Sequence, residues 1–568
     1  MKESTEPQKP TSNELLKQSS PALAGAIAAT LADTAADRFS EDDNQFLKFH
    51  GIYQGDDRDL RKNGKKYIFM VRLRLPGGVV SPAQYLACDR LATTHANGTL
   101  RVTSRQSLQF HGVVKQGLGP LLKGINDALI TTLAACGDVN RNVMAPPTPA
   151  TNGLGEQVQE LARQAAAALS PQTKVYHSIW VDGVELNLED PAIKNFSDPL
   201  YGQTYLPRKF KIGFAIPPLN DVDVLTNCCG FIAIAGEGGR LEGFNLTAGG
   251  GMGRSHGNDA TFPRVADVIG FLPPDKVVDV ARATLTIHRD FGSRTNRKHA
   301  RLKYVIADRG PVWFREELQS RLGFVLQDAK PFRFDRQGDA FGWHQQADGR
   351  WFLGLFVETG RIKDKGDWRM MTGLRRVVEA HQPEIRLTPA NNVILANIAD
   401  RERGSISQLF AEHGIDVEHQ GTVLRRASMA CVALPTCGLA LAEAERYLPK
   451  LLPEIETLLE EVGLGGEEIT VRMTGCPNGC ARPYMAEIGL VGKAPGRYQI
   501  YLGGNLASTR LNRLHRDGVK DTDLLTELRP LFTRFAQERQ GREERFGDWV
   551  ARVLWQENAG APAPAPQI

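Results

Sequence analysis

The 568-residue chain has no long apolar run and no strong charge bias. No stretch approaches the roughly 18 consecutive apolar residues that a membrane-spanning helix needs. Its 69 Lys and Arg against 65 Asp and Glu leave a formal charge of only +4, so neither a polybasic coat nor an acidic tail dominates. The start, MKESTEPQKPTSNE, is too polar for a signal peptide, and we therefore expect a cytoplasmic protein.

The sequence also lacks two signatures of nucleotide binding. The glycine-rich segments at 235–239 (AGEGG) and 248–253 (AGGGMG) do not have the G-x-G-x-x-G spacing of a dinucleotide-binding turn, so we interpret both as tight turns. Aromatic residues make up 7% of the chain and do not alternate with basic residues as a base-stacking platform would require. A non-enzymatic metal protein that binds nucleic acid is therefore the weaker hypothesis.

Cysteine is scarce, and four of the eight cysteines fall between residues 431 and 480. They form the pairs Cys431-x5-Cys437 and Cys476-x3-Cys480. Thiolates bind soft metals and iron–sulfur clusters, and the glycines of TGCPNGCARP expose backbone N–H groups to cluster sulfurs. Neither pair has the C-x2-C spacing of zinc knuckles, so the pattern favours one four-iron cluster over a structural zinc ion or inert thiols. The remaining cysteines are interpreted as core residues: Cys88, Cys136, Cys228 and Cys229.

An internal repeat indicates the fold. Residues 98–113 (GTLRVTSRQSLQFHGV) align with 383–398 (PEIRLTPANNVILANI), and both segments have the pattern of β-strands. Upstream of each lies another β-rich run, at Tyr67 and at Trp351, followed by a helical segment. Ser81 and Pro82 are typical of the start of the first of these helices. Chance similarity is the alternative, but the matching flanks favour a duplicated α+β unit.

The sequence predicts that the chain is divided into several domains between two flexible ends. We expect a flexible N-terminal arm over 1–45 and a flexible Ala/Pro-rich tail over 556–568. Residues 46–133 plus 334–406 are expected to form the repeat domain, with further domains at 134–333 and 407–555. In the last of these, residues 438–463 predict a long amphipathic helix.

Several motifs together resemble the sulfite and nitrite reductase family. The segments SMACVALPTC and TGCPNGC are similar to those that hold sirohaem joined to a [4Fe–4S] cluster in that family. Other segments resemble the haemoprotein (beta) subunits of its assimilatory, NADPH-dependent branch: FHGIYQGDDRD, VRLRLPGG, RVTSRQSLQFHG, NRNV, GQTYLPRKFK, GFNLTAGGG and GLVGKAPGRY. Any one of these motifs is weak, whereas the set is specific.

The resemblance implies a three-domain α+β fold with a pseudo-two-fold repeat of ferredoxin-like half-domains. It implies that Cys431, Cys437 and Cys476 bind cluster irons, and that Cys480 bridges the cluster and the iron of sirohaem. A shared thiolate would couple the two centres for electron transfer.

The same resemblance assigns roles to basic residues. Those implied to face the substrate are Arg72, Arg141, Lys209 and Lys211. Arginines present fixed donors to an oxyanion, whereas lysines have more easily tuned pKa values and are suited to donate protons. Residues implied to hold sirohaem carboxylates or to line the cofactor are Arg101, Arg105, Gln109, Arg208, Arg301 and Asn478. Arg301 stands where relatives often have lysine.

The implied reaction is the six-electron reduction of sulfite to sulfide in sulfate assimilation. Because the chain has no dinucleotide signature, electrons from NADPH are expected to arrive through a flavoprotein (FAD/FMN) partner. The alternative is a ferredoxin-linked sulfite or nitrite reductase, although Lys211 stands where ferredoxin-linked nitrite enzymes tend to have asparagine. No nucleic-acid or membrane partner is expected.

Overall fold

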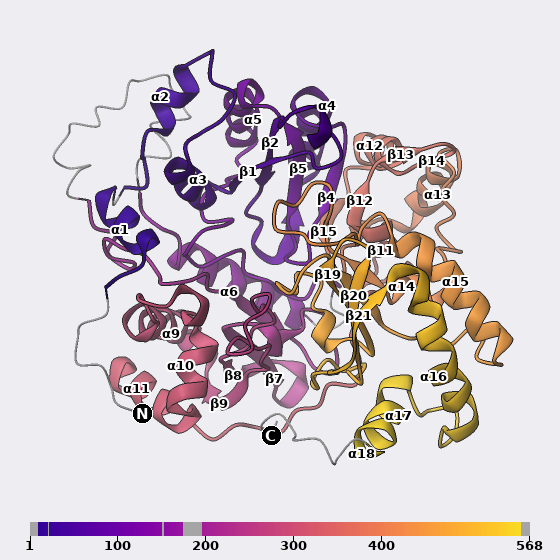
Figure 1. Ribbon diagram of the computed structural model, residues 1–568. Coiled ribbons are helices and arrows are strands. Elements are labelled where there is room, and N and C mark those ends of the chain that lie inside the picture. Colours follow the sequence, from indigo (N-terminus) through magenta and orange to yellow (C-terminus); the bar gives the residue numbers. More distant parts are fainter. Residues whose placement is uncertain (1–8, 21, 150–152, 174–195, 558–568) are drawn as a thin grey trace.

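The strands of the chain form several separate sheets, and helices lie around these sheets (Figure 1). The computed structural model describes residues 9–20, 22–149, 153–173 and 196–557. Within these residues there are three five-stranded sheets, one four-stranded sheet and one two-stranded sheet. The larger sheets meet near the middle of the molecule and helices lie on the outside (Figure 1). This arrangement confirms the predicted α+β class.

Two of the five-stranded sheets form the repeat. The first has the order β1-β2-β5-β4-β12 and the second β10-β11-β16-β15-β3, with every neighbouring pair antiparallel. The first half comprises β1 (Ile52–Asp56), β2 (Tyr67–Arg72), α4 (Pro82–His95), β4 (Leu100–Val102), β5 (Leu108–Val113) and α5 (Lys115–Asp127). The second comprises β10 (Gly342–Gln345), β11 (Trp351–Leu355), α12 (Met370–His381), β15 (Glu384–Leu387), β16 (Val393–Ile398) and α13 (Arg403–Ala411).

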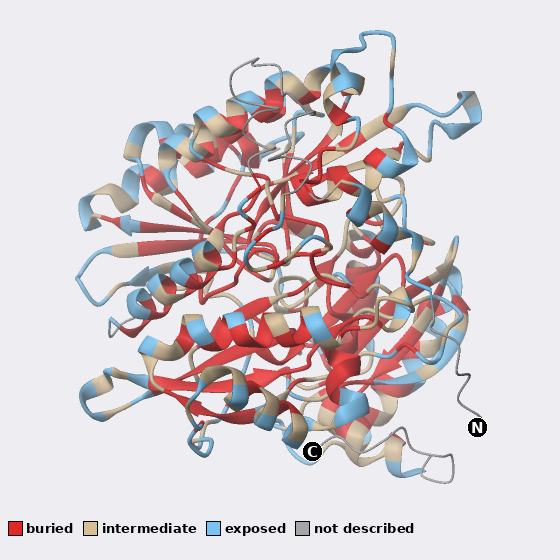
Figure 2. Cartoon of the chain, turned by 90° about the vertical axis from the view of Figure 1, so that its left-hand side faces the viewer, coloured by how far each residue is buried: buried red, intermediate tan, exposed pale blue. Residues whose placement is uncertain are grey.

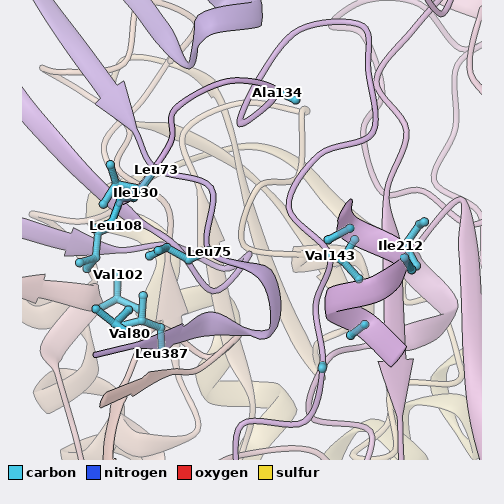
Figure 3. Packing of buried hydrophobic residues seen from close by; sticks show 14 of the residues in the cluster. Leu73, Leu75, Val80, Val102, Leu108, Ile130, Ala134, Val143, Ile212 and Leu387 are labelled. Atoms are coloured by element: carbon cyan, nitrogen blue, oxygen red, sulfur yellow. The ribbon is translucent and has the colours of Figure 1, made fainter. Parts of the chain in front are cut away.

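The two halves exchange a short edge strand. β3 (Val79–Val80) leaves the first half and pairs with β15, while β12 (Arg361–Ile362) leaves the second half and pairs with β4. Val80 lies beside Leu387 and Val102 at this junction (Figure 3). Each sheet therefore has its fifth strand only because the other half supplies it.

The details of the repeat confirm the sequence alignment. Each predicted segment is a hairpin, and both hairpins turn in the same way: Thr103 N–H donates to Ser107 O at 2.8 Å, and Thr388 N–H to Asn392 O at 3.0 Å. The predicted start of α4 is also confirmed, since Ser81 Oγ accepts from Gln84 N–H at 3.2 Å. A duplicated unit explains why the same hairpin turn occurs at the aligned positions of both halves.

The other two large sheets also share one topology. β6 is parallel to β7, and β7, β8 and β9 are antiparallel; β18 to β21 repeat this pattern, with the short β17 added beside β18. Their strands are β6 (Ile212–Ala215), β7 (Cys229–Ala235), β8 (Leu241–Ala248), β9 (Asp267–Leu272), β17 (Met429–Ala430), β18 (Val471–Thr474), β19 (Ile488–Ala494), β20 (Arg497–Leu502) and β21 (Arg513–Lys520). The two-stranded sheet pairs β13 (Asp364–Lys365) with β14 (Trp368–Arg369).

Helices belong to the β6–β9 unit and to the β17–β21 unit. The helices that precede the second repeat half in the sequence are α6 (Leu154–Ala168), α9 (Val277–Phe291), α10 (Leu302–Arg309) and α11 (Pro311–Leu322). Those near the C-terminus are α14 (Val423–Arg426), α15 (Leu448–Glu461), α16 (Leu524–Glu538), α17 (Phe546–Arg552) and α18 (Leu554–Glu557). The helix predicted over 438–463 is wrong in its first part: α15 begins only at Leu448, with Pro449 in its first turn. The predicted tail lies outside the described residues from 558 onward, and its first two residues end α18.

Buried residues occupy the strands and the inner faces of the helices, whereas exposed residues follow the outer faces and loops (Figure 2). One apolar cluster runs through both repeat halves and the β6–β9 unit, and a second fills the C-terminal unit, including the fully buried Trp549. In the part of the chain that the structure describes, no helix is long and apolar enough to cross a membrane.

The N-terminal segment differs from the predicted flexible arm. This segment contains α1 (Ser12–Ser19), α2 (Ile27–Ala32) and the start of α3 (Glu41–Leu47). Lys17 Nζ donates to Leu206 O at 2.8 Å and to Glu14 at 2.6 Å, and it lies 3.6 Å from Asp138. The polar composition of this segment suggested exposure, but several of its charges are buried against partners in the 134–333 region.

Replacing Ile27 with alanine tests whether this segment is packed. Ile27 is fully buried in the large cluster, so the variant is expected to lose about 2–5 kcal/mol of unfolding free energy. Leu15→Ala is the matched control, because Leu15 is 54% exposed and its truncation should change stability by only about 0.5 kcal/mol. Equal, small effects in chemical denaturation would contradict the packed arrangement.

Candidate active site

The four clustered cysteines lie on loops at the ends of β17 and β18. Cys431 follows β17 directly, and its Sγ accepts from Gly475 N–H at 3.3 Å. Cys476 follows β18 and accepts from Asn478 Nδ2 at 3.5 Å. All four are free thiols, and Cys480 is the exposed one. The loops thus bring together cysteines that are far apart in sequence.

The chemistry of these thiols fits a metal cluster. Burial and the neighbouring Cys480 raise the pKa of Cys431 and of Cys437, and raise that of Cys476 to about 12. Several thiolates held close together repel one another, so they need a cationic metal centre as counter-charge. Among the described residues, no three His, Cys, Asp or Glu side chains converge as ligands of one ion. Four free thiols on neighbouring loops are the ligand type that holds the irons of an iron–sulfur cluster.

Several predicted residues form a row across the first repeat sheet. Arg72 on β2 lies opposite Gln109 on β5, which lies opposite Arg101 on β4, which lies opposite Arg361 on β12. Residues directly opposite each other in antiparallel strands share a face of the sheet. The sheet register therefore explains why distant sequence positions contribute to one surface.

The guanidinium group of Arg72 contacts three other residues. Its Nη1 donates to Cys136 Sγ at 2.9 Å, its guanidinium lies 5.9 Å from the centre of the Tyr53 ring, and Nε donates to the amide oxygen of Gln109 at 3.0 Å. Arg141, which is buried, donates from Nε to Gly137 O at 2.8 Å. Both arginines are thus oriented by the protein before any anion binds.

Arg101 and Arg105 use most of their donors within the protein. Arg101 pairs with Glu445 at 2.9 Å and donates to Ala430 O at 2.8 Å, beside the first cluster cysteine. Arg105 donates to Asn142 O at 2.8 Å and to Asn227 Oδ1 at 2.9 Å, and burial lowers its pKa to about 9. Arg101 therefore contacts the segment that leads to Cys431, whereas Arg105 connects the first hairpin turn to Asn142 and Asn227.

Lys209, Lys211 and Arg208 differ from these arginines. Among the described residues, no hydrogen-bond or ion-pair partner is found for their charged groups, although all three are half-buried. Burial, reinforced by Arg208 and Arg301, lowers the pKa of Lys209 to about 7, and burial and Arg105 lower that of Lys211 well below its ordinary value. Cys480 is among the charged neighbours of both lysines. Unpaired cations beside this cysteine suit an anionic cofactor or substrate.

Arg301 and Asn478 lie in the same region, and Arg301 is a charged neighbour of Lys209 and Lys211. Arg301 is 6% exposed, its buried Nε has no hydrogen-bond partner among the residues that the structure describes, and its Nη2 lies 3.8 Å from Cys228 Sγ. A Cβ added to Gly253 would come within 3.1 Å of Asn478 O, so this glycine permits the close approach of the two loops. The buried, unpartnered guanidinium atom again fits a carboxylate-bearing cofactor.

Sequence reasoning missed some residues of this site. Cys136, interpreted as a core residue, contacts Arg72, and Cys228 contacts Arg301. Glu445 joins Arg101 to Arg361, whose Nε lies 2.8 Å from it. The position of Cys136, shortly before the NRNV motif, could have indicated that it belongs to the site. Glu445 lies in the segment that was predicted as a helix, and nothing in the sequence around it indicated a role in the site.

Comparisons with known proteins define the class of this site. The family model for the nitrite/sulfite reductase ferredoxin-like half domain matches residues 60–128 and 344–413, the two repeat halves. The model for the nitrite and sulphite reductase 4Fe-4S domain matches residues 162–326. That match covers the β6–β9 unit; the four clustered cysteines lie in the C-terminal unit of similar topology.

Individual relatives narrow the class further. The "Sulfite reductase [NADPH] hemoprotein beta-component" of Geobacillus kaustophilus is 49% identical over 96% of each chain, and that of Myxococcus xanthus is 48% identical over 98% of this chain and 97% of its own. The solved structure of the Mycobacterium tuberculosis NirA protein superposes with a TM-score of 0.76 at 25% identity and covers 96% of this chain and 97% of its own.

The chain belongs to the nitrite and sulfite reductase family. It is an oxidoreductase whose cofactors are sirohaem and one [4Fe–4S] cluster, as the resemblance of its motifs predicted. The predicted repeat of ferredoxin-like half-domains is confirmed as well.

Proposed function

We propose that the chain is the haemoprotein component of an NADPH-dependent sulfite reductase and reduces sulfite to sulfide in sulfate assimilation. One observation carries this proposal: unpaired, half-buried cations gather next to the exposed cysteine of a four-cysteine cluster site. The names of the relatives that match over nearly the full length support the same activity. A cytoplasmic location fits the predicted thiolate-bound cluster.

The cysteines and cations have different proposed roles. Cys431, Cys437, Cys476 and Cys480 would hold the [4Fe–4S] cluster, and Cys480 would also hold sirohaem. When bound, these groups would supply the electrons for the reduction of sulfite. Residues proposed to hold sirohaem carboxylates or line its cavity are Arg101, Arg105, Gln109, Arg208, Arg301 and Asn478.

Four basic residues would act on the substrate. Arg72 and Arg141 bind the oxygens of sulfite, since their guanidinium groups are already oriented by the protein. Lys209 and Lys211 supply protons as oxygen leaves as water, because their lowered pKa values make proton release easy near neutral pH. All four cations also stabilise negative charge that grows in the transition state.

The electron donor is proposed to be a separate flavoprotein subunit. The relatives are named as beta-components of an NADPH enzyme, and neither glycine-rich segment of this chain has the dinucleotide spacing. The purified chain alone is therefore expected not to oxidise NADPH. It should reduce sulfite when a small reduced dye replaces the donor.

A visible spectrum with and without sulfite, followed by a dye-driven assay, tests the proposed function. A sirohaem band that shifts when sulfite is added under reducing conditions is expected, together with dye-driven sulfide release. Nitrite serves as the competing substrate. A chain that is colourless after expression in a sirohaem-producing host, or that releases ammonia from nitrite but no sulfide from sulfite, would contradict the proposal.

A further inference from the structure

Two equivalent loops of the duplicated sheets meet through an ion pair. One loop connects β6 to β7 and the other connects β18 to β19; both pairs are parallel, and the loops have equal length. Asp223 and Arg482 occupy the same position in the two loops, each with left-handed backbone, at φ 46° and 52°. They form an ion pair with each other. Residues related by a two-fold axis meet only near that axis, so this pair marks the pseudo-symmetry axis of the molecule.

Asp223 lies between two arginines in the interior. Its carboxylate pairs with Arg482 Nε and with Arg472 Nη1 at 2.8 Å, and the side chain of Asp223 is 0% exposed. The side chains of Arg472 and Arg482 are 5% and 8% exposed. A buried cation needs a counter-charge, and here one carboxylate serves two guanidinium groups.

Arg482 connects this ion pair to both repeat halves. Its Nη1 donates to Ser104 O and its Nη2 to Pro389 O, each at 3.0 Å. Ser104 and Pro389 hold equivalent positions in the two hairpin turns of the repeat. One guanidinium group thus fastens the two ferredoxin-like halves to the loop between β18 and β19.

The same loop carries Cys480, two residues before Arg482. Arg482 N–H donates to Gly479 O at 3.0 Å, and Ser104 Oγ donates to Cys480 O at 2.8 Å. The backbone on both sides of Cys480 is therefore held by contacts that depend on where Arg482 lies. The carboxylate of Asp223, from the other duplicated sheet, is the charged partner of this guanidinium group beside those two backbone oxygens.

We propose that Asp223 is a positioning residue for the cofactor centre: by anchoring Arg482 it sets the position of Cys480 relative to the other three cysteines. This inference rests on the proposed role of Cys480 as the shared ligand. It gives the loop of the β6–β9 sheet, which supplies no cluster cysteine, a function in the cluster site of its counterpart.

Asp223→Asn tests the proposal, because it keeps the side-chain size and removes the charge. The variant is expected to lower the iron and sirohaem content of the purified protein about twofold or more, since outer contacts of metal ligands change metal affinity about 10–100-fold. In the protein that still holds cofactor, the visible and electron paramagnetic resonance spectra of the coupled centre should shift.

Asp89→Asn is the matched control. Asp89 pairs with Arg375 at 2.6 Å between α4 and α12, and its side chain is 4% exposed. Within the described part of the chain, neither its ion pair nor its side-chain hydrogen bond is with a residue assigned to the cofactors. This variant should lower thermal stability and leave the spectra and iron content unchanged. If Asp223→Asn does not fold, Asp223→Glu, which keeps the charge but displaces it, is expected to shift the spectra in the same direction.

The outcomes separate this inference from the proposed function. A wild-type protein without the coupled spectrum contradicts the proposed function, whatever the variants do. A wild-type protein with that spectrum and an Asp223→Asn or Asp223→Glu variant with identical spectra and iron content overturns the positioning role. Spectral changes of equal size in Asp89→Asn overturn it too, because they would reflect general destabilisation.

Discussion

Replacing Cys480 with serine is expected to abolish sulfite reduction and to remove the spectrum of the coupled centre. Cys480 is the exposed member of the four cysteines, and Lys209 and Lys211 have it as a charged neighbour. Changes to residues that only support a metal ligand cost about 10–100-fold, so loss of the shared ligand should exceed 10²-fold in dye-driven turnover. Visible and electron paramagnetic resonance spectra would be recorded together with the rate.

Cys88→Ser is the control for that variant. Cys88 is fully buried in α4 and lies outside the cluster loops, so serine there should lower stability and leave the cofactor spectrum intact. A Cys480→Ser protein with the wild-type spectrum and full turnover would remove the proposed assignment of the shared thiolate.

The second large effect is expected from Lys209 and pH. Its pKa, lowered to about 7 by burial and the neighbouring arginines, leaves the side chain protonated below that pH and neutral above it. A proton donor works only in its protonated form, so kcat/KM for sulfite should be high at low pH and fall about tenfold per pH unit above the pKa. Carboxylates of bound sirohaem favour the charged form and would move this decline to a pH at or above 7.

Lys209→Arg separates charge from proton donation. Arginine keeps the positive charge but does not release its proton, so kcat is expected to fall by about 10²-fold or more and the decline tied to Lys209 should disappear from the pH profile. Lys123→Arg, at a side chain 64% exposed, should leave rate and profile unchanged. A Lys209→Arg enzyme with the wild-type rate and pH profile would show that protons come from elsewhere.

Much of the fold was predictable because its signals are local or repeated. The two hairpins were found from aligned sequence, and Ser81 with Pro82 marked the start of α4 through capping chemistry that involves only neighbouring residues. The spacing of the cysteines likewise indicated a cluster. Such signals operate over a few residues and need no knowledge of the tertiary structure.

Other features depend on contacts between distant segments and carried no local signal. The composition of residues 9–45 indicated an exposed arm, yet Lys17 is buried because Glu14 and Leu206 O accept its hydrogen bonds. The network of Glu445 with Arg101 and Arg361 likewise joins three separate segments. The start of α15 was misplaced because the apolar spacing continues into a region where tertiary contacts outweigh helix propensity.

The exchanged edge strands have a consequence for synthesis of the protein. When the first half leaves the ribosome, β4 has no neighbour on its outer side, because β12 belongs to a segment that is made much later. An unpaired strand edge is a template for wrong pairing with other chains. The nascent first half is therefore expected to depend on chaperone protection until the second half emerges, and neither half should be obtainable as a stable separate fragment.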